Sequence, residues 1–248
     1  MPTRAPLLRA VAQTAYTLYA LCVFCACGLA ALLLVVVLPG VRRRRAATRA
    51  LARALFGLAG MRLRLRGMEH LPAGQCVIVA NHASYLDGLV FTAVLPPRFG
   101  FVIKREMAQV PLAGSLLRRI GSEFVERFNR HKGAADARRV VRNAVNGESL
   151  VFFPEGTFSA RPGLAKFHAG AFITATRAGC PIVPAVVRGT RRALPPGRLR
   201  PWPAVITVTL LAPLPTHADD SARETAVLRE RARAAILGQL EEPDLAAA

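Results

Sequence analysis

Apolar and polar positions form alternating segments of strand and helix length along most of the chain. Runs of apolar residues predict buried strands, whereas apolar positions spaced three or four residues apart predict helices. The predicted strands cover residues 62–66, 76–80, 99–104, 121–125, 149–153, 182–187 and 205–211. The predicted helices cover residues 89–95, 110–119, 134–145 and 171–178, and a last helix follows the capping box Ser221-x-x-Glu224. This alternation predicts an α/β fold, a single layered domain with a largely parallel sheet flanked by helices.

Two of the predicted helices have clear apolar faces. In the last helix, Leu228, Ala232, Ile236 and Leu240 recur at intervals of four and should face the core. In residues 134–145, the expected inward positions are Val140, Val141, Ala144 and Val145, and the expected solvent-facing positions are Arg138, Arg139 and Arg142.

The N-terminal segment differs from the rest because it is almost entirely apolar. Residues 10–41 contain no charged side chain. As a helix they would extend roughly 48 Å, more than a hydrocarbon core of about 30 Å. The sequence Arg42-Arg43-Arg44-Arg45 follows at once, which is typical of a stop-transfer flank on the cytoplasmic side. A cleaved signal peptide is the alternative, but its apolar region is shorter. The pattern predicts an N-terminal membrane helix, within an anchor of residues 1–45, and a cytoplasmic location for the remaining chain.

Residues 46–66 join this anchor to the predicted domain of residues 67–248. Apolar side chains lie among arginines and alanines in the first part of the segment, as in an amphipathic helix. Such a helix rests in the headgroup layer of a membrane or packs on the domain, and the pattern is compatible with both. Leu63 and Leu65 then alternate with arginines, which predicts a half-exposed edge strand.

The charge balance is strongly basic. The chain has 34 Lys and Arg against 15 Asp and Glu, a formal net charge of +19. Such an excess attracts nucleic acid, an anionic membrane surface or phosphorylated substrates, and charge alone does not choose among them. The apolar N-terminal segment favours anionic membrane lipids, so no nucleic acid is expected. Three of the five cysteines lie in that segment without a histidine or a second pair beside them, so neither a metal site nor a disulfide is expected.

Polar residues with catalytic potential follow the predicted strand 76–80, in the sequence Asn81-His82-Ala83-Ser84-Tyr85-Leu86-Asp87. On an ideal helix His82 and Asp87 would point roughly 140° apart and could not meet. In a turn from a strand into a helix, however, the Asp87 carboxylate can reach one ring nitrogen and leave the other as a base. The same residues would also suit an ordinary turn, because Ser84 can cap a helix and Asp87 favours a first turn.

The His-x-x-x-x-Asp spacing resembles the catalytic box of the glycerophospholipid acyltransferase family, and further blocks of that pattern follow in order. The resemblance covers about residues 67–188. The second block is Lys104-Arg105-Glu106-Met107 with Pro111 and Gly114, followed by residues 121–127, which end in Glu126-Arg127. The third block is Phe153-Pro154-Glu155-Gly156-Thr157-Phe158-Ser159, and the fourth is Ile182-Val183-Pro184-Ala185-Val186. The chain departs from the pattern at Phe158, where the family commonly has an arginine.

The resemblance implies transfer of a fatty acyl group to the free hydroxyl of a lysophospholipid. The acyl donor would be acyl-coenzyme A or acyl carrier protein as a co-substrate, without a cofactor, and the first choice of acceptor is 1-acylglycerol 3-phosphate. An unphosphorylated acceptor such as a lyso-ornithine lipid is the alternative, because Phe158 removes a phosphate-binding cation that Arg161, Lys166 or His168 would have to replace. The implied catalytic residues are His82 and Asp87, and the implied substrate-binding residues are Lys104, Arg127, Glu155, Gly156 and Thr157.

The residue chemistry is compatible with these roles. Arg127 offers a bidentate fork to a phosphate, and Lys104 offers a point charge at another strand end. Glu155, on a turn set by Pro154 and Gly156, can accept a hydrogen bond from a substrate hydroxyl or brace a cation. Backbone amides near the His82 turn, or a water, would stabilise the oxyanion. Variants His82→Ala and Asp87→Ala should abolish transfer while the protein stays folded.

Three other hypotheses remain open from the sequence. Ser84 could act as an acyl-enzyme nucleophile, although no Gly-x-Ser-x-Gly elbow surrounds it. The chain could hydrolyse the same lipids if water replaces the acceptor. It could also be a non-enzymatic, membrane-tethered module that binds polyanions through its basic charge.

Overall fold

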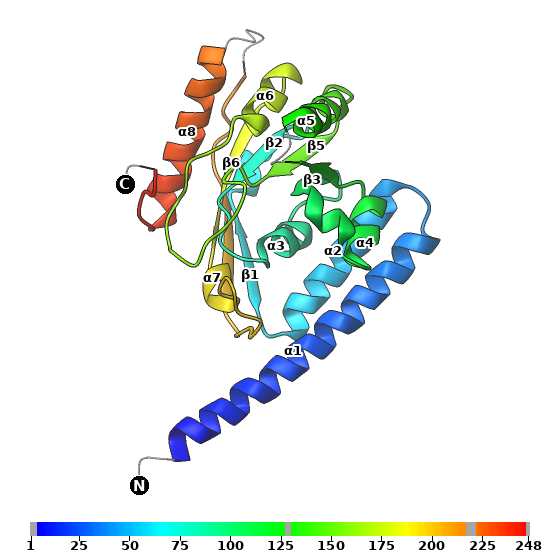
Figure 1. Cartoon of the computed structure of the whole chain (residues 1–248), viewed down its shortest axis with the longest axis vertical. Helices are drawn as coiled ribbons and strands as arrows, with labels where there is room; N and C mark the ends of the chain where they lie inside the picture. The colour runs from blue at the N-terminus through cyan, green and yellow to red at the C-terminus, as the bar shows by residue number, and fades with distance from the viewer. Residues whose placement is uncertain (1–3, 127–129, 217–221, 247–248) are drawn as a thin grey trace.

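The computed structural model describes residues 4–126, 130–216 and 222–246. Its strands form one sheet in the order β1-β7-β6-β2-β5-β3-β4. The strands are β1 (Arg62–Arg66), β2 (Val77–Ala80), β3 (Phe99–Lys104), β4 (Glu123–Val125), β5 (Ser149–Phe152), β6 (Ile182–Arg188) and β7 (Val205–Leu210). The helices are α1 (Arg4–Val37), α2 (Val41–Leu58), α3 (Asp87–Val94), α4 (Ala113–Arg119), α5 (Arg130–Val145), α6 (Gly170–Arg177), α7 (Thr190–Ala193) and α8 (Ala222–Leu240). The largely parallel α/β architecture is as predicted, with helices on both faces of the sheet (Figure 1).

The strand directions define one functional edge of the sheet. The paired strands run parallel except for β6 and β7, which are antiparallel. Strands β2 to β6 therefore all end at the same edge, where β1 and β7 begin. We call this the carboxyl edge. Side chains that follow β2, β3 and β5 meet there, as in other open α/β sheets.

Alternate residues of the central strand face two separate cores. Ile78 and Ala80 of β2 pack with Phe56 of α2 and Phe91 of α3. Val77 and Val79 point the other way, into a core built on helices α5, α6 and α8. All four residues of β2 are buried, because a parallel central strand covered on both faces has no solvent side. As predicted, Leu228, Ala232, Ile236 and Leu240 of α8 are buried in the second core.

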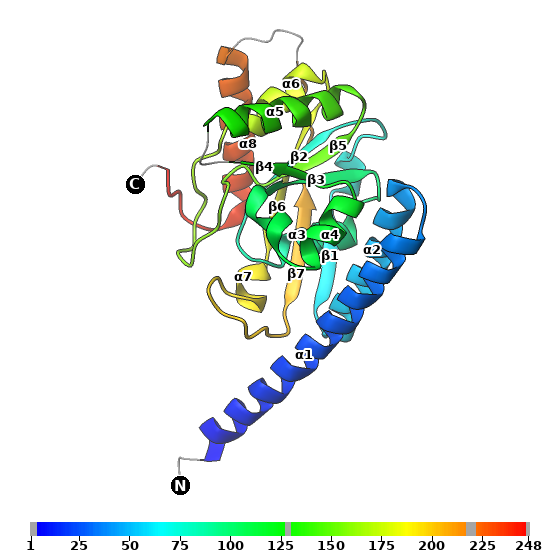
Figure 2. The same ribbon diagram turned by 45° about the vertical axis from the view of Figure 1, so that its right-hand side comes forward.

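Helix α1 is the predicted apolar N-terminal helix, and residues 8–37 are long and apolar enough to cross a membrane. Helix α1 runs back along α2, and its N-terminal part extends beyond the domain (Figures 1 and 2). The hydroxyl groups of Tyr16 and Tyr19 donate hydrogen bonds to the carbonyl groups of Ala59 and Leu58, over 2.8 and 3.0 Å. Most other large side chains of α1, including Leu21 and Leu33, are exposed. The helix therefore carries an apolar face that the domain does not cover.

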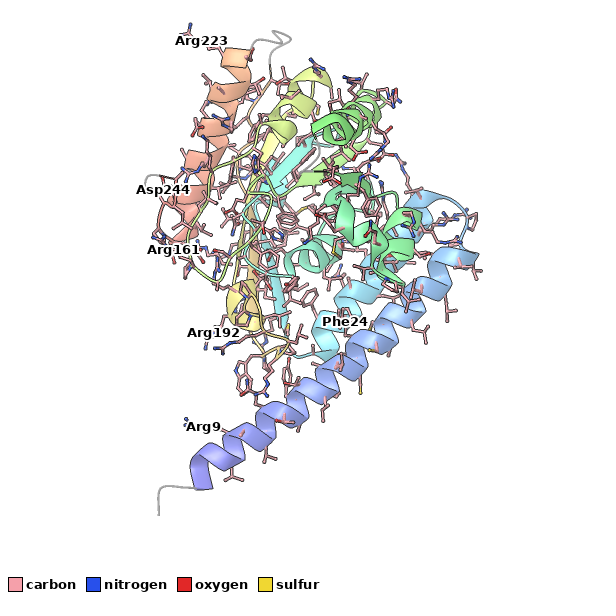
Figure 3. The ribbon with its side chains drawn as sticks, in the orientation of Figure 1. Arg9, Phe24, Arg161, Arg192, Arg223 and Asp244 are labelled. Atoms are coloured by element: carbon pink, nitrogen blue, oxygen red, sulfur yellow. The ribbon has the colours of Figure 1, made fainter. Side chains whose placement is uncertain are left out.

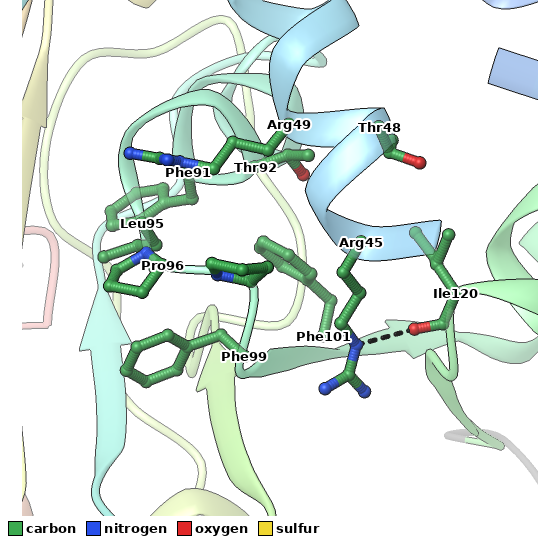
Figure 4. Close-up of a pocket in the computed structure, with 11 residues that line it drawn as sticks. Arg45, Thr48, Arg49, Phe91, Thr92, Leu95, Pro96, Phe99, Phe101 and Ile120 are labelled. Atoms are coloured by element: carbon green, nitrogen blue, oxygen red, sulfur yellow. Dashed lines mark hydrogen bonds between the residues drawn. The ribbon is translucent and has the colours of Figure 1, made fainter. Parts of the chain in front are cut away.

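The arginine cluster at 42–45 lies in the first turn of α2, and one of its members is a buried structural residue. Arg45 is 8% exposed. Its guanidinium donates to the carbonyl groups of Ile120, Arg98 and Gly121, and it forms an ion pair with Glu148. Figure 4 shows the Ile120 contact beside a pocket between α2, α3 and β3. This pocket has a volume of about 20 Å³ and lies near the start of β3, away from the carboxyl edge. It has room for about one water molecule rather than a lipid.

Several local expectations differ from the structure. Strand β1 is the predicted half-exposed edge strand, because it lies at one end of the sheet and alternates between exposed and half-buried residues, but its pairing with β7 makes it part of the main sheet rather than of a separate joining segment. Val145 of α5 is 57% exposed rather than inward, because the helix ends there. Arg139 is not a solvated charge, since it forms ion pairs with Glu123 and Asp136. The capping residue Ser221 lies outside the described residues.

Candidate active site

The turn formed by residues 81–87 joins β2 to α3 at the carboxyl edge and brings His82 to Asp87. The Nδ1 atom of His82 lies 2.8 Å from Oδ2 of Asp87. The Asp87 side chain is fully buried, whereas that of His82 is 19% exposed. With an ionised Asp87, the His82 Nδ1 atom carries the proton, and Nε2 is left as the basic ring nitrogen. The strand-to-helix geometry predicted from the spacing is present.

Asp87 also organises the backbone of the turn. Its Oδ2 atom accepts hydrogen bonds from the N–H groups of Ala83 and Ser84, over 2.6 and 2.9 Å. A carboxylate at the first residue of a helix is favoured by the helix dipole and by free amide donors. These two N–H groups already donate to Asp87 and are therefore not available to stabilise an oxyanion. The sequence had suggested backbone amides near the His82 turn for that role, and these two are excluded from it.

Glu155 follows strand β5, the neighbour of β2, and clamps the turn from the other side. Its Oε1 atom accepts the N–H of His82 over 2.7 Å, and its Oε2 atom accepts the N–H of Ala165 over 2.8 Å. Gly156 allows the turn because it adopts a φ of 79°, which favours glycine. Both carboxylate oxygens of Glu155 are therefore bound to protein amides. The expected direct contact of Glu155 with a substrate hydroxyl would have to compete with these bonds.

The environment of Glu155 favours its protonated form. Burial raises the pKa of Glu155 from 4.5 to about 7. The N–H groups of Ala165 and His82 lower this pKa, and the charges of Asp87 and Glu242 raise it. Burial dominates because it penalises the charged carboxylate more than two hydrogen bonds favour it.

A raised pKa makes the contribution of Glu155 to stability depend on pH. The contribution is fully present below the unfolded pKa of 4.5 and is lost as the pH rises through about 7. Between about pH 5 and about pH 8, the wild-type protein should lose up to about 3 kcal/mol of unfolding free energy relative to Glu155→Gln, which does not titrate. Thermal unfolding in detergent micelles, followed by circular dichroism, measures the difference in slope. The exposed Glu230→Gln is the control and should keep the wild-type slope; equal slopes for all three proteins would refute the assignment.

Aromatic rings surround the imidazole of His82. The ring of Phe153 stacks on it at 4.4 Å between centroids, and the ring of Phe158 meets it edge-on at 4.5 Å. Phe158 also contacts Tyr85 at 4.8 Å. The structure thus shows Phe158 packed beside the base, whereas the resemblance to the family pattern had indicated only that an arginine is missing there.

The remaining predicted site residues are less closely placed. Lys104 is exposed at the end of β3, and β5 separates this strand from β2. Gly156 and Thr157 follow Glu155 in its turn, and Thr157 is exposed. Arg127 lies outside the described residues. Hydrogen bonds therefore join His82 to Asp87 and to Glu155, while Lys104 lies at the same edge of the sheet on a strand that is not adjacent to β2.

Two polar residues of the turn have structural partners that the sequence did not reveal. The side chain of Asn81 exchanges two hydrogen bonds with the backbone of Val187, over 2.8 and 3.0 Å. Ser84 is fully buried, and its hydroxyl donates to the carbonyl of Leu194. It also accepts the N–H of Leu86. A hydroxyl held in this way is poorly placed to attack an acyl group, which argues against Ser84 as a nucleophile.

Comparison with known proteins now adds to this geometry. The family model described as Acyltransferase matches residues 62–188, just over half of the chain. The chain belongs to the acyltransferase family. The matched region of this acyltransferase begins at β1 and ends with β6, so it contains the 81–87 turn and Glu155.

Relatives of this acyltransferase are about a third identical to it within the regions that align. The chloroplastic 1-acyl-sn-glycerol-3-phosphate acyltransferase of Brassica napus is 32% identical over 54% of this chain and 39% of its own length. The 1-acyl-sn-glycerol-3-phosphate acyltransferase of Escherichia coli is 31% identical over 62% of this chain and 63% of its own. The chain thus spans about two fifths of the length of the plant relative. A crystal structure of the 1-acyl-sn-glycerophosphate acyltransferase PlsC from Thermotoga maritima covers 94% of the acyltransferase, with a TM-score of 0.73. It covers 96% of its own chain and is 20% identical, so it supports the fold alone.

Proposed function

We propose that this acyltransferase moves a fatty acyl group from a thioester donor, acyl-coenzyme A or acyl carrier protein, to the free hydroxyl of a lysophospholipid. The first choice of acceptor is 1-acylglycerol 3-phosphate, which would give phosphatidic acid. The observation that carries the proposal is the short contact between His82 Nδ1 and the buried Asp87 carboxylate, 2.8 Å long, at the carboxyl edge of the sheet. The names of the relatives at 31–32% identity support the same acceptor.

In the proposed reaction, Nε2 of His82 takes the proton from the acceptor hydroxyl, and Asp87 holds the ring and stabilises the imidazolium. The hydroxyl oxygen attacks the thioester carbonyl carbon and forms the new ester bond. The carbon–sulfur bond breaks, and the imidazolium returns its proton to the departing thiolate. The ring stacking of Phe153 keeps the imidazole from rotating away from this path.

Binding of the acceptor phosphate is proposed for cations at the carboxyl edge. Lys104 is exposed there and is the first candidate among the described residues. Arg105, the next residue, is held by the buried Asp136, which also pairs with Arg139. The positive charge of Arg105 is therefore already compensated by the Asp136 carboxylate. Arg127 stays a candidate from the sequence, since it directly follows strand β4 and Glu126.

The proposed location of the protein is a membrane, with the domain on its cytoplasmic face. The uncovered apolar face of α1 supports insertion, and the arginines of α2 beside its C-terminal end support the orientation. A site held at the lipid surface suits an acceptor and a product that both reside in the bilayer.

An assay of the detergent-solubilised full chain tests the proposal. Labelled acyl-coenzyme A and acyl carrier protein are supplied separately with 1-acylglycerol 3-phosphate, lyso-ornithine lipid or no acceptor. We expect labelled phosphatidic acid with at least one donor. Free fatty acid without an acceptor would instead indicate a hydrolase. Binding without any turnover would favour the non-enzymatic module, and transfer only to lyso-ornithine lipid would reassign the acceptor.

A further inference from the structure

We propose that residues 198–202, here called the docking loop, form a second contact with the membrane, separate from α1, and that they recognise anionic phospholipid headgroups. The loop connects α7 to β7 and has the sequence Arg198-Leu199-Arg200-Pro201-Trp202. It takes no part in the acyl transfer proposed above. Its partner is a bilayer surface of negative charge.

The exposure pattern of the loop is unusual for a surface that faces only water. Leu199 is 84% exposed and Trp202 is 42% exposed. Arg198 and Arg200 are exposed on either side of Leu199 and have no ion pair among the described residues. An exposed leucine and tryptophan between arginines match the chemistry of the membrane interface. There the apolar groups enter the acyl boundary, and the cations meet the headgroups.

The docking loop is attached directly to the membrane helix. The ring of Trp202 meets the ring of Tyr16 of α1 edge-on, at 6.1 Å between centroids. Tyr16 in turn donates to the carbonyl of Ala59, and the N–H of Arg62 donates to the carbonyl of Ala204. Both ribbon views place the segment after α7 beside the middle of α1 (Figures 1 and 2). A bilayer that takes up the N-terminal part of α1, which extends beyond the domain, therefore lies within reach of the loop.

Exposed side chains on neighbouring elements extend the same surface. Leu58 at the end of α2 and Val205 at the start of β7 are 57% and 46% exposed. Arg192 of α7 is exposed as well, on the side of α7 that faces away from α1 (Figure 3). Exposed apolar side chains, with arginines beside them, thus continue from the docking loop to the end of α2. Such continuity is expected of a single membrane-facing surface.

The loop is also tied to the 81–87 turn. The N–H of Trp202 donates to the carbonyl of Ala193 over 2.7 Å, which closes the segment on α7. The next carbonyl, that of Leu194, accepts the hydroxyl of Ser84. Both the docking loop and the turn lie at the carboxyl edge, since β7 begins and β2 ends there. Docking of the loop would therefore hold the His82 side of the sheet toward the lipid.

Trp202 is the only tryptophan in the chain, so its emission reports on the loop directly. The full chain is reconstituted into vesicles of phosphatidylcholine, with or without phosphatidylglycerol, whose acyl chains are either ordinary or brominated. Brominated chains quench a tryptophan that enters the acyl boundary. We expect loss of most of the Trp202 emission in anionic vesicles and a smaller loss in neutral ones. Emission that brominated chains leave unchanged would overturn the proposal.

Variants separate the loop from the anchor. Arg198→Ser/Arg200→Ser should lower quenching in anionic vesicles to the level of neutral ones, and Leu199→Ser should lower it in both. The matched control is Arg138→Ser/Arg142→Ser, which removes two exposed arginines from α5, at the far end of the sheet from the loop. This control should keep wild-type quenching. All variants should retain wild-type acyl transfer in detergent, which shows that they fold. Equal quenching in the loop variants and the control would refute headgroup recognition by the loop.

Discussion

His82→Ala should lower the rate constant of acyl transfer by about 10²–10⁴-fold, the usual contribution of a positioned general base. The substitution removes the imidazole ring that Asp87 holds through its Nδ1 atom. It should not unfold the protein, because the N–H of residue 82, which binds Glu155, belongs to the backbone and remains. The rate at saturating acceptor and donor measures the effect, and circular dichroism checks the fold.

His70→Ala is the matched control for this experiment. His70 follows β1, which ends at the opposite edge of the sheet from His82, and its Nδ1 atom lies 3.0 Å from the carbonyl oxygen of Leu210. The substitution therefore removes an imidazole from outside the candidate site. The control should keep the wild-type rate, whereas a wild-type rate in His82→Ala would refute the general-base role and with it the proposed mechanism.

The parts of the fold that sequence predicts well are those set by local pattern. The apolar run 76–80 predicted β2, and the structure places its alternate residues in two cores. The meeting of His82 and Asp87 was also predictable, because a short turn leaves few ways for the chain to bend. The α/β alternation followed from the order of such segments, since short connections restrict the topology.

Contacts between distant segments were not predictable in the same way. Glu155 binds the N–H of His82 across 73 positions of sequence. The contact exists because β5 pairs with β2 in the sheet. No local sequence pattern specifies which strands become neighbours. The buried Arg45 is a second case. Four consecutive arginines look equivalent in the sequence, and only the packing of α2 against the loops of Arg98 and Ile120 selects one of them. Arg139 was misjudged for the same reason.

Asp87→Asn should lower the transfer rate about as much as His82→Ala, by about 10²–10⁴-fold, and unlike His82→Ala it should also destabilise the protein. The sequence alone had suggested that the variant Asp87→Ala stays folded. In the structure, however, Oδ2 of Asp87 accepts three hydrogen bonds, from His82, Ala83 and Ser84. The other oxygen, Oδ1, is buried without a hydrogen-bond partner among the described residues.

Neither orientation of an asparagine satisfies this site. With the amide nitrogen in the place of Oδ2, it would face three N–H donors. With the nitrogen in the place of Oδ1, it would be buried where the described residues offer no acceptor. Leaving such a donor unpaired costs about 1–3 kcal/mol, so the melting temperature should fall. The loss of charge also removes the stabilisation of an imidazolium at His82. Thermal unfolding and the rate measured well below the melting temperature separate the two effects. A variant with normal stability, or one whose rate recovers once the protein is kept folded, would contradict the double role of Asp87.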